Sequence, residues 1–388
     1  MSASALAGQH EIAIIGGGLG GTTAAILLQR AGFPCLVYEQ ASAFSRVGAG
    51  INLAPNSLRV LRQLGVLEHL LQCGLQPREK ISRDWASGQV TYRADICALA
   101  EKYEAPFLAI HRADLQAVLS AAMAPDTVAF GKRLIATNEH NGRVVLAFAD
   151  GSRSEADIVI GADGVNSKVR EALLGPETPT YSGLAAYRSL FPADALGSLN
   201  VADYTKWWGP DRDVIAYYTT RTRDEFYLLA ITPEEWGTPD LALQIGDVAR
   251  VRTAFQDFHT DVQKILAACT EVTRAPMLQR DPLSLWSRGR IVMLGDACHP
   301  MAPYMGQGAG MAIEDAFMLA RCLQAEREPE AAFRRYEATR FERTARVQVE
   351  SNKNDWMRYA MDHSWVYGYD VLSAPIAHEF SGSRETGT

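Results

Sequence analysis

Short apolar runs alternate with helical repeats near both ends of the chain. Near the N-terminus the pattern predicts a buried strand over Glu11–Ile15, a helix over Thr22–Ala31 and a second strand over Pro34–Tyr38. A similar order returns late in the chain. A strand is predicted at Ile291–Leu294, a loop with two prolines and three glycines follows, and a helix runs over Met311–Arg321. Strands that alternate with helices in this way predict a parallel sheet covered by helices.

The middle of the chain has a different pattern. From Tyr181 to about Arg274, aromatic residues are frequent and apolar positions alternate with a period of two. This predicts an antiparallel sheet, with a helical return over Asp247–Cys269. Ile81–Leu99 is interpreted as further strand material that forms a hairpin. The charged, periodic stretch Glu330–Ala360 predicts a long helix, interpreted as a solvated face or a packing or dimer element rather than a site.

Together these patterns predict an α/β chain of mixed α+β character. Its main part is a Rossmann-like dinucleotide-binding domain, into which an antiparallel-sheet domain for the substrate is inserted. We place the dinucleotide-binding domain at residues 1–77, 105–180 and 275–330, and the substrate domain at 78–104 and 181–274. A C-terminal helical segment occupies 331–388.

A glycine-rich turn joins the first predicted strand to the first helix. Residues 16–21 fit the pattern G-x-G-x-x-G, and Glu39 ends the next strand 23 residues after Gly16. Gly16 permits the tight turn, Gly18 lets the backbone approach a pyrophosphate, and Gly21 lets the helix pack closely on the strand. Glu39 would accept hydrogen bonds from a ribose. The complete unit predicts a dinucleotide site, without distinguishing FAD from NAD.

Two further acidic turns follow predicted strands. Asp163 comes after the apolar run Asp157–Ile160, and Asp296 comes after the late strand. The glycine-rich loop beyond Asp296 leads into a helix start, whose free N–H groups and partial positive charge favour an anion. Arg112 lies in the first turn of another predicted helix, where it opposes the helix dipole, so it is expected to face an anionic ligand. Arg46 could hold a phosphate.

The composition narrows the choice of function. The 388 residues carry a net charge of −7 and contain no run of 18 or more apolar residues, so neither a nucleic acid nor a membrane is expected as partner. The six cysteines form no C-x-x-C pair, and no metal site is predicted. The scattered cysteines and the absence of a secretory leader favour a cytoplasmic location.

The three acid-and-glycine turns, in this order and spacing, resemble the single-component FAD-dependent aromatic hydroxylases, the class A flavoprotein monooxygenases of the p-hydroxybenzoate and salicylate hydroxylase group. That family carries the N-terminal glycine pattern with a ribose-binding acid, a D-G motif in mid-chain and a late G-D-A-x-H-x-x-x-P-x-x-G-Q-G motif. The resemblance implies bound FAD and a transient NADH or NADPH. It assigns to these cofactors the residues Gly16, Gly18, Gly21, Glu39, Arg46, Arg112, Asp163, Asp296, Gly308 and Ala309.

The resemblance also implies a reaction. A hydroxylated aromatic or pyridine carboxylic acid, such as 6-hydroxynicotinate, would be hydroxylated through a flavin C4a-hydroperoxide, with or without loss of carbon dioxide. Tyr217 matches a substrate-site tyrosine of the members that act on 6-hydroxynicotinate, and Pro303 would line the side where oxygen reacts. Those members carry histidine at the positions of Asn52, Asp213 and Tyr304, so the resemblance implies a pocket with a changed lining.

Three residues are therefore the main candidates for substrate chemistry. Tyr217 and Tyr304 are expected to contact the ring hydroxyl, and Asp213 could act as a base or relay. The charge of Asp213 argues against a substrate carboxylate beside it. The expected partners are a small aromatic substrate and O2, and the sequence is compatible with a homodimer. The alternatives are a salicylate-type or other phenolic ring hydroxylase, an FAD-linked reductase or oxidase without oxygen insertion, and a flavin-bound sensor.

Overall fold

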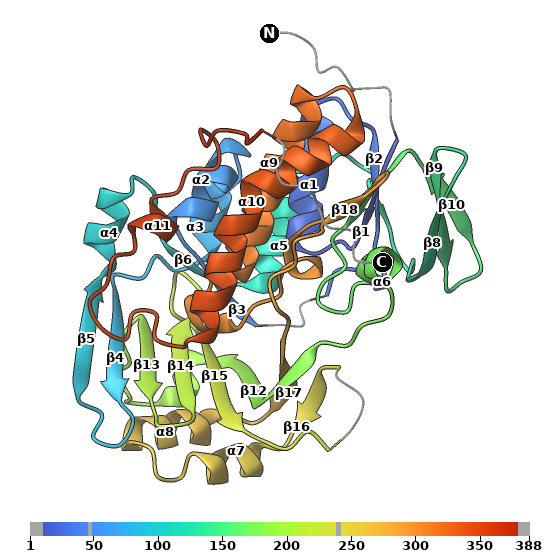
Figure 1. The fold of residues 1–388 in the computed structure, drawn as a ribbon. Helices are drawn as coiled ribbons and strands as arrows, with labels where there is room; N and C mark the ends of the chain where they lie inside the picture. The colour runs from blue at the N-terminus through green and yellow to red at the C-terminus, as the bar shows by residue number, and fades with distance from the viewer. Residues whose placement is uncertain (1–10, 46–48, 238–241, 379–388) are drawn as a thin grey trace.

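The computed structural model describes residues 11–45, 49–237 and 242–378. A six-stranded sheet with the order β18-β19-β11-β1-β2-β7 lies in the upper half of the molecule as drawn in Figure 1. Five of its strands run parallel, and β18 pairs antiparallel with β19 at one edge. The strands are β1 (Ile12–Ile15), β2 (Cys35–Tyr38), β7 (Val128–Ala129), β11 (Ile158–Gly161), β18 (Ser287–Arg288) and β19 (Ile291–Met293).

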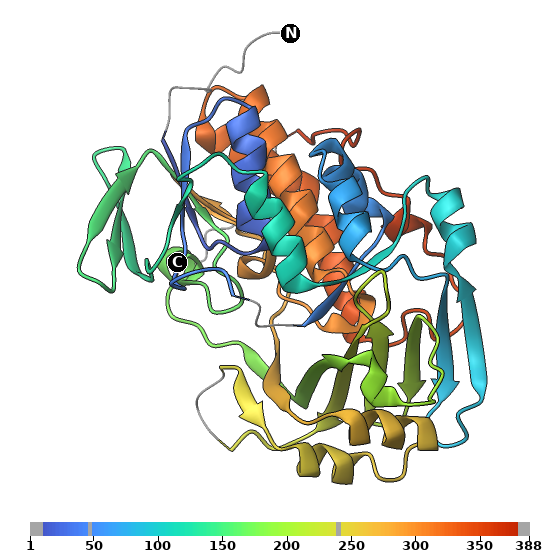
Figure 2. The same cartoon turned by 180° about the vertical axis from the view of Figure 1, so that it is seen from behind.

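Helices from distant parts of the chain pack on this sheet. α1 (Leu19–Arg30) follows β1 directly, and it packs against α5 (Arg112–Ala121) and α9 (Gly308–Ala325). α10 (Pro329–Asn352) packs against α9 in turn, and Figure 2 shows α1, α5 and α9 together from behind. Every residue of β1 and β11 is buried, as expected for parallel strands that are covered on both faces.

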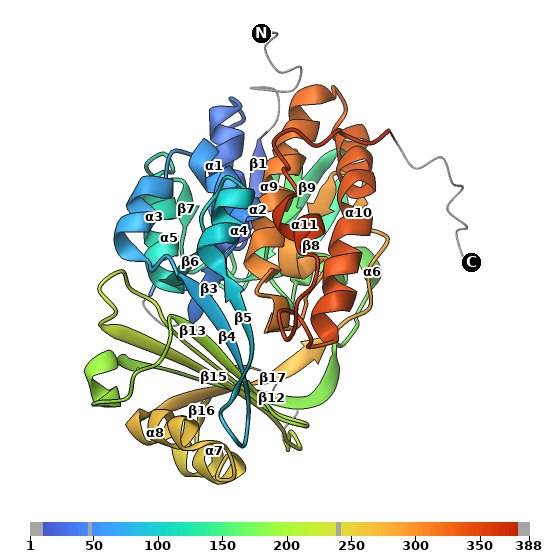
Figure 3. The same cartoon turned by 90° about the vertical axis from the view of Figure 1, so that its left-hand side faces the viewer.

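An eight-stranded sheet with the order β16-β17-β12-β15-β14-β13-β4-β5 forms the other half of the molecule, below the helices in Figure 3. Its pairings are antiparallel except that of β4 with β13. Two helices, α7 (Val248–Ala254) and α8 (Thr260–Ala268), cover its far face. The strands are β4 (Glu79–Asp84), β5 (Val90–Asp95), β12 (Thr180–Pro192), β13 (Tyr204–Trp208), β14 (Asp213–Tyr218), β15 (Glu225–Pro233), β16 (Gln244–Gly246) and β17 (Val272–Gln279).

Smaller elements complete the fold. β3 (Gly50–Leu53) pairs with β6 (Leu108–His111), and β8 (Leu134–His140), β9 (Arg143–Phe148) and β10 (Arg153–Ala156) form a separate antiparallel sheet. Over the described ranges, no helix combines the length and the apolar character needed to cross a membrane. The remaining α-helices are α2 (Pro55–Gln63), α3 (Leu67–Cys73), α4 (Ile96–Lys102), α6 (Lys168–Leu174) and α11 (Ser364–Tyr367).

The predicted fold class is confirmed, with a Rossmann-like sheet and an inserted antiparallel sheet. The predicted domain boundaries stay a prediction; the large sheet takes its strands from residues 79–95 and 180–279. The predicted hairpin over Ile81–Leu99 is shorter than expected. β5 ends at Asp95, whose side chain accepts a hydrogen bond from the Ala98 N–H and so begins α4.

The C-terminal helix also differs from the prediction over Glu330–Ala360. α10 ends at Asn352, and the chain then turns where Asn354 and Met357 adopt left-handed conformations, with φ of 53° and 59°. The helix is not mainly a solvated face, because charged residues such as Arg340 are fully buried against α9. Trp356 and Met357, just beyond the helix, line the central cavity of the molecule.

Candidate active site

Two connected hollows run through the middle of the molecule. One, of about 990 Å³, lies beside the glycine turn and Glu39. The other, of about 440 Å³, lies between β3, the start of α9 and the eight-stranded sheet. The two share Gly18, Arg112, Ala162 and Gly164 on their walls, so they form one cavity. A long ligand could therefore reach from the end of β2 to the sheet.

The glycine turn needs its glycines for packing as well as for the ligand. Gly16 has a φ of 104°, and a Cβ on it would lie 2.4 Å from the carbonyl oxygen of Ala162. A Cβ on Gly21 would lie 2.0 Å from the carbonyl oxygen of Gly16, so only glycine lets α1 approach β1 this closely. The Gly17 N–H donates to Oε2 of Glu39 at 2.7 Å. Each carboxylate oxygen can accept a second hydrogen bond, which leaves Glu39 available to a ribose.

Asp163 lies at the turn between β11 and α6. It accepts hydrogen bonds from the Ser167 hydroxyl (2.5 Å) and the Lys168 N–H (2.7 Å). Burial raises the pKa of Asp163, and these hydrogen bonds oppose the rise. The next residue, Gly164, has a φ of 79°, and among the described residues no atom lies within 4 Å of an added Cβ. Asp163 thus holds the turn that presents the Gly164 backbone to the cavity.

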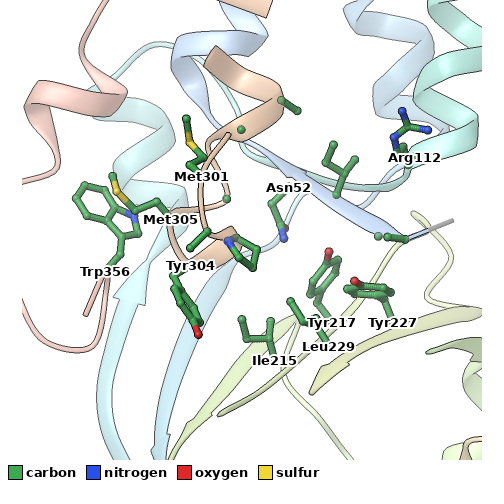
Figure 4. A pocket seen from close by; sticks show the side chains of 18 of the residues that line it. Asn52, Arg112, Ile215, Tyr217, Tyr227, Leu229, Met301, Tyr304, Met305 and Trp356 are labelled. Carbon is green, nitrogen blue, oxygen red and sulfur yellow. The ribbon is translucent and has the colours of Figure 1, made fainter. Parts of the chain in front are cut away.

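Asp296 and Arg112 lie near the junction of the two hollows. Asp296, in the 3-10 turn η2 (Gly295–Ala297), is open to the cavity although it lies deep in the molecule. Burial raises its pKa, and the charges of His299 and Arg112 oppose this rise. Arg112 is the first residue of α5 and extends toward the cavity (Figure 4). Its guanidinium lies 3.7 Å from the position of a Cβ on Gly18.

The start of α9 closes this part of the cavity. Gly308 and Ala309 both line it, and the first turn of the helix carries no acidic residue. The positive end of the helix dipole is therefore presented to the cavity, which favours an anionic group there. The predicted phosphate ligand Arg46 lies outside the described residues.

These features fit FAD. The backbone at Gly18, Gly164 and Gly308 borders the cavity, and a Cβ on any of the three would have no neighbour closer than 3.7 Å. This leaves a smooth wall for a long ligand. Glu39, the predicted ribose acceptor, lies at one end, and a helix start suited to a negative charge lies at the other.

Residues that lie opposite each other on neighbouring strands point to the same face of a sheet. On the cavity face of the large sheet, such residues form two rows of side chains that run across the strands. The first row holds three tyrosines whose rings are in contact. The Tyr217 ring is stacked on Tyr204, with centres 5.3 Å apart, and is tilted against Tyr227, with centres 5.0 Å apart. Lys80 ends this row, its Nζ 4.6 Å from the Tyr204 ring centre. The second row consists of Ser82, Lys206, Ile215, Leu229 and Arg188.

Four of the predicted substrate residues line this end of the cavity: Asn52 from β3, Tyr217 from β14, and Pro303 and Tyr304 from the loop before α9. Figure 4 shows Asn52, Tyr217 and Tyr304. Burial raises the pKa of Tyr217, and Arg188 and a hydrogen bond with Asn52 oppose this only in part. Burial also raises the pKa of Tyr304. Both hydroxyls therefore stay protonated at neutral pH and can donate a hydrogen bond.

Asp213, the fifth predicted residue, is set back from the cavity wall. Its Oδ2 lies 3.6 Å from Nζ of Lys206 and accepts a hydrogen bond from the side-chain amide of Asn354. Lys206 in turn donates to the amide oxygen of Asn354. Lys206 lines the cavity and Asp213 does not, so the repulsion predicted between Asp213 and a substrate carboxylate acts over a longer distance than expected.

The cavity residues that were not predicted from the sequence include Lys80, Arg188, Lys206 and Trp356. The signal for Lys206 was present in strand β13, where alternation places it on the same face as two aromatic residues. A lysine on a buried aromatic face is unusual. Trp356 gave no such signal, because it follows a helix that ends earlier than its charge pattern indicates.

The fold and the cavity together define a flavin-dinucleotide enzyme with a separate ring-binding sheet. A family described as "FAD binding domain" matches residues 9–351, and the chain belongs to this family. Its relatives are FAD-dependent flavoprotein monooxygenases, and the chain is one of them.

Individual relatives cover almost the whole chain. The 6-hydroxynicotinate 3-monooxygenase of Bordetella bronchiseptica is 47% identical over 95% of this chain and 97% of its own length. The 3-amino-4-hydroxybenzoate 2-monooxygenase PtnB3 of Streptomyces platensis is 36% identical, covering 94% and 97%. Among solved structures, Klebsiella pneumoniae HpxO in complex with FAD and uric acid superposes with a TM-score of 0.80 at 29% identity, covering 93% of this chain and 92% of that one.

Proposed function

We propose that this protein hydroxylates a hydroxylated aromatic or pyridine carboxylic acid such as 6-hydroxynicotinate, with O2 as co-substrate and NADH or NADPH as transient reductant. The observation that carries the proposal is the continuous cavity from Glu39 to the tyrosine-rich face of the large sheet. The 47% identity to a 6-hydroxynicotinate 3-monooxygenase supports the choice of ring.

The charges at the sheet end of the cavity support an acidic substrate. Lys80 and Arg188 both line it, and within the described residues neither has a carboxylate at ion-pair distance. Burial lowers the pKa of Lys80 to about 8, so its ammonium group is still mostly charged at neutral pH. Buried cations without an anionic partner are costly, so a ligand that brings a negative charge is favoured there.

The residues at the glycine-turn end would hold the cofactor. Gly16, Gly18 and Glu39 would receive its pyrophosphate and ribose, and the start of α9 at Gly308 and Ala309 would receive the anionic edge of the reduced flavin. When bound, FAD supplies the activation of O2, which no side chain provides.

The substrate is oriented by the chain itself. Tyr217 and Tyr304 would donate hydrogen bonds to the oxygen of the ring hydroxyl, and Pro303 would hold the loop beside the reacting carbon. Trp208 and Trp356 line the same end of the cavity and would keep water away from it. Asp213, set back from the wall, would act as a relay rather than touch the ring.

Stopped-flow reduction by NADH, over a panel of hydroxylated benzoates and pyridines, tests the proposal. We expect ring acids to accelerate flavin reduction, and the product formed under ¹⁸O2 to contain one labelled oxygen. The product mass also shows whether carbon dioxide is lost. Reduction without label in any product would support a reductase or oxidase instead, and no reduction with any ring acid would support a sensor.

Two further proposals concern the cellular location and the oligomeric state of the protein. A cytoplasmic location is supported by the six cysteines, all described and all free thiols. A homodimer is the second proposal, and α10, which carries the exposed Val349, is the element proposed to form its interface. Light scattering after size exclusion measures the mass in solution, and a monomer mass at micromolar concentration would refute the dimer.

A further inference from the structure

Lys206 is a buried lysine in the wall of the cavity, at the centre of the large sheet. Its side chain is 5% exposed, and its Nζ lies 3.4 Å from the ring centre of Trp208 and 4.8 Å from that of Tyr304. Tyr304 belongs to the loop that carries Pro303, on the opposite side of the cavity from the sheet. The amine therefore borders the cavity next to Tyr304, one of the two residues expected to contact the ring hydroxyl.

The amine is held in place from behind. Asp213 on the neighbouring strand β14 and Asn354 from the turn after α10 both contact it, and Asn354 also bonds Asp213. Asn354 reaches this position through its left-handed conformation, with a φ of 53°. Such a residue persists when surrounding contacts fix it, and it is common at functional sites. An amine has three hydrogen-bonding positions, so one can still face the cavity.

On the basis of the proposed function, we infer that Lys206 is the catalytic base that accepts the proton of the substrate's ring hydroxyl, with Asp213 and Asn354 as positioning residues. In this step the ring O–H bond breaks, the proton bonds to the lone pair of the neutral amine, and the electron pair of the O–H bond stays on the ring oxygen. Nothing is oxidised or reduced. The resulting ring oxyanion is electron-rich, as aromatic hydroxylation requires.

The surroundings of Lys206 suit a base at neutral pH. Burial lowers its pKa to about 7, although the charge of Asp213 and their hydrogen bond oppose this. From the segment after α10, Arg358 lowers the pKa further and Asp355 raises it. Tyr304 faces it from the loop and stays protonated. A base whose pKa is close to the working pH combines a large neutral fraction with a useful proton affinity.

The other groups at this end are less suited to the task. Burial raises the pKa of Tyr204, Tyr217 and Tyr227, so these hydroxyls keep their protons. Asp213 is closest in type to a base, but it does not reach the cavity and is bonded to Asn354. Arg188 is an arginine, which does not give up its proton. Lys80 also lines the cavity, but burial lowers its pKa only to about 8, so its amine stays mostly charged at neutral pH. Lys206 has the lower pKa, and its amine lies 4.8 Å from the ring centre of Tyr304, so it is the group better placed to act as the base.

The test uses the FAD-loaded enzyme and 4-hydroxybenzoate, whose phenol and phenolate forms differ in ultraviolet absorption. Binding is followed by difference spectra and by calorimetry in buffers of different ionisation enthalpy, which counts protons released. At about pH 8 the amine is mostly neutral, so the wild type should bind the phenolate form with almost no proton release. Lys206→Arg cannot accept a proton, so it should bind the phenolate and release about one proton.

Two further variants complete the test. Lys206→Met with Asp213→Asn removes both charges without leaving either one buried alone, and it should bind the neutral phenol. Lys264→Met, on α8 at the far face of the sheet, is the matched control and should behave as the wild type. The flavin absorbance of each protein reports whether it has folded and kept its cofactor.

Several results would overturn the assignment. The wild type could bind 4-hydroxybenzoate in its phenol form, it could release a full proton on binding at about pH 8, or it could fail to bind the compound; each result would count against the base. With a substrate from the panel of hydroxylated benzoates and pyridines, kcat/KM of the double variant should be lower than that of the wild type by about 100-fold or more. The wild-type kcat/KM should rise as the pH passes through about 7, and in Lys206→Arg this rise should be absent. A labelled product from the wild type, together with an unchanged pH profile in Lys206→Arg, would retain the proposed function and reject the base.

Discussion

At the scale of single residues, Gly50 is the clearest constraint on the substrate end of the cavity. A Cβ on this residue would lie 2.7 Å from the Tyr217 hydroxyl and 2.8 Å from the Tyr227 ring, so Gly50→Ala must displace the tyrosine row. We expect kcat/KM to fall by about 100-fold, because small displacements of a positioning group are costly in catalysis. Gly237→Ala is the control, since no atom of the residues that the structure describes lies within 4 Å of a Cβ at this position. Wild-type kinetics in Gly50→Ala would contradict this role of the tyrosines.

Residue roles could be predicted where a motif is local in the sequence. Gly16, Gly21 and Glu39 belong to one strand-turn-helix-strand unit, and the geometry of that unit requires residues of these types. The partners of Lys206 cannot be found in this way. Asp213 lies across a hairpin, and Asn354 is 148 residues further along the chain. Their proximity depends on how the C-terminal turn docks on the sheet, which no short pattern encodes.

At the scale of elements, a buried ionic cluster joins α9 to α10. Arg340 of α10, fully buried, pairs with Glu314 (2.6 Å) and Asp315 (2.7 Å) of α9. Arg340→Met would leave both carboxylates without this cation, and we expect it to lower the free energy of unfolding by about 3–5 kcal/mol. Arg335→Met is the matched control, because its partly exposed pair with Glu326 should be worth about 1 kcal/mol or less. Urea titration measures the free energy of unfolding of both variants. Equal decreases in the two would show that the buried cluster contributes no more to stability than the partly exposed pair.

The same cluster makes the free energy of unfolding depend on pH in the acid range. Burial raises the pKa of Asp315, but His299, Arg340 and their hydrogen bonds outweigh this and lower it to about 2. A depressed carboxyl pKa contributes stability that is present above the unfolded value and lost as the pH falls through the folded value. We therefore expect the unfolding free energy to decrease as the pH falls from about 4 to about 2. In Asp315→Asn this decrease should be smaller, which urea titrations at several pH values would show.

The charge pattern of α10 shows why element roles were harder to predict than element types. A long periodic segment with many charges was correctly predicted as a helix, but its charges left open whether it forms a solvated face or a packing or dimer element. In the structure Glu337 and Arg340 are buried, because α9 and Trp286, just before β18, supply their partners. Helix periodicity is a local property, whereas the burial of an ion pair depends on a second element. The pattern therefore predicts where a helix forms more readily than which side it buries.

At the scale of the whole molecule, one cavity is assembled from parts of the chain that are far apart. The glycine turn, the loop before α9 and the large sheet were each expected to contribute, and each lines it. The turn after α10 was not expected, and it supplies Trp356 and Met357. This turn closes the side of the cavity next to Lys206, so the C-terminal region helps to separate the substrate from solvent.

This closure leads to a prediction about how efficiently reducing equivalents are used. Trp356 is 8% exposed, and its indole N–H donates to the Tyr367 hydroxyl at 3.0 Å. Trp356→Ala would open the cavity wall to water without touching the glycine turn, so FAD should still bind. Because water in the site favours side reactions, we expect a smaller share of the NADH consumed to yield hydroxylated product, and more to yield hydrogen peroxide.

Trp85→Ala is the control for a general loss of packing. It removes a tryptophan packed against Phe258 on the far face of the sheet, and it should keep the wild-type ratio of peroxide to product. If both variants gave the same ratio of peroxide to product, the turn would have no part in sealing the site.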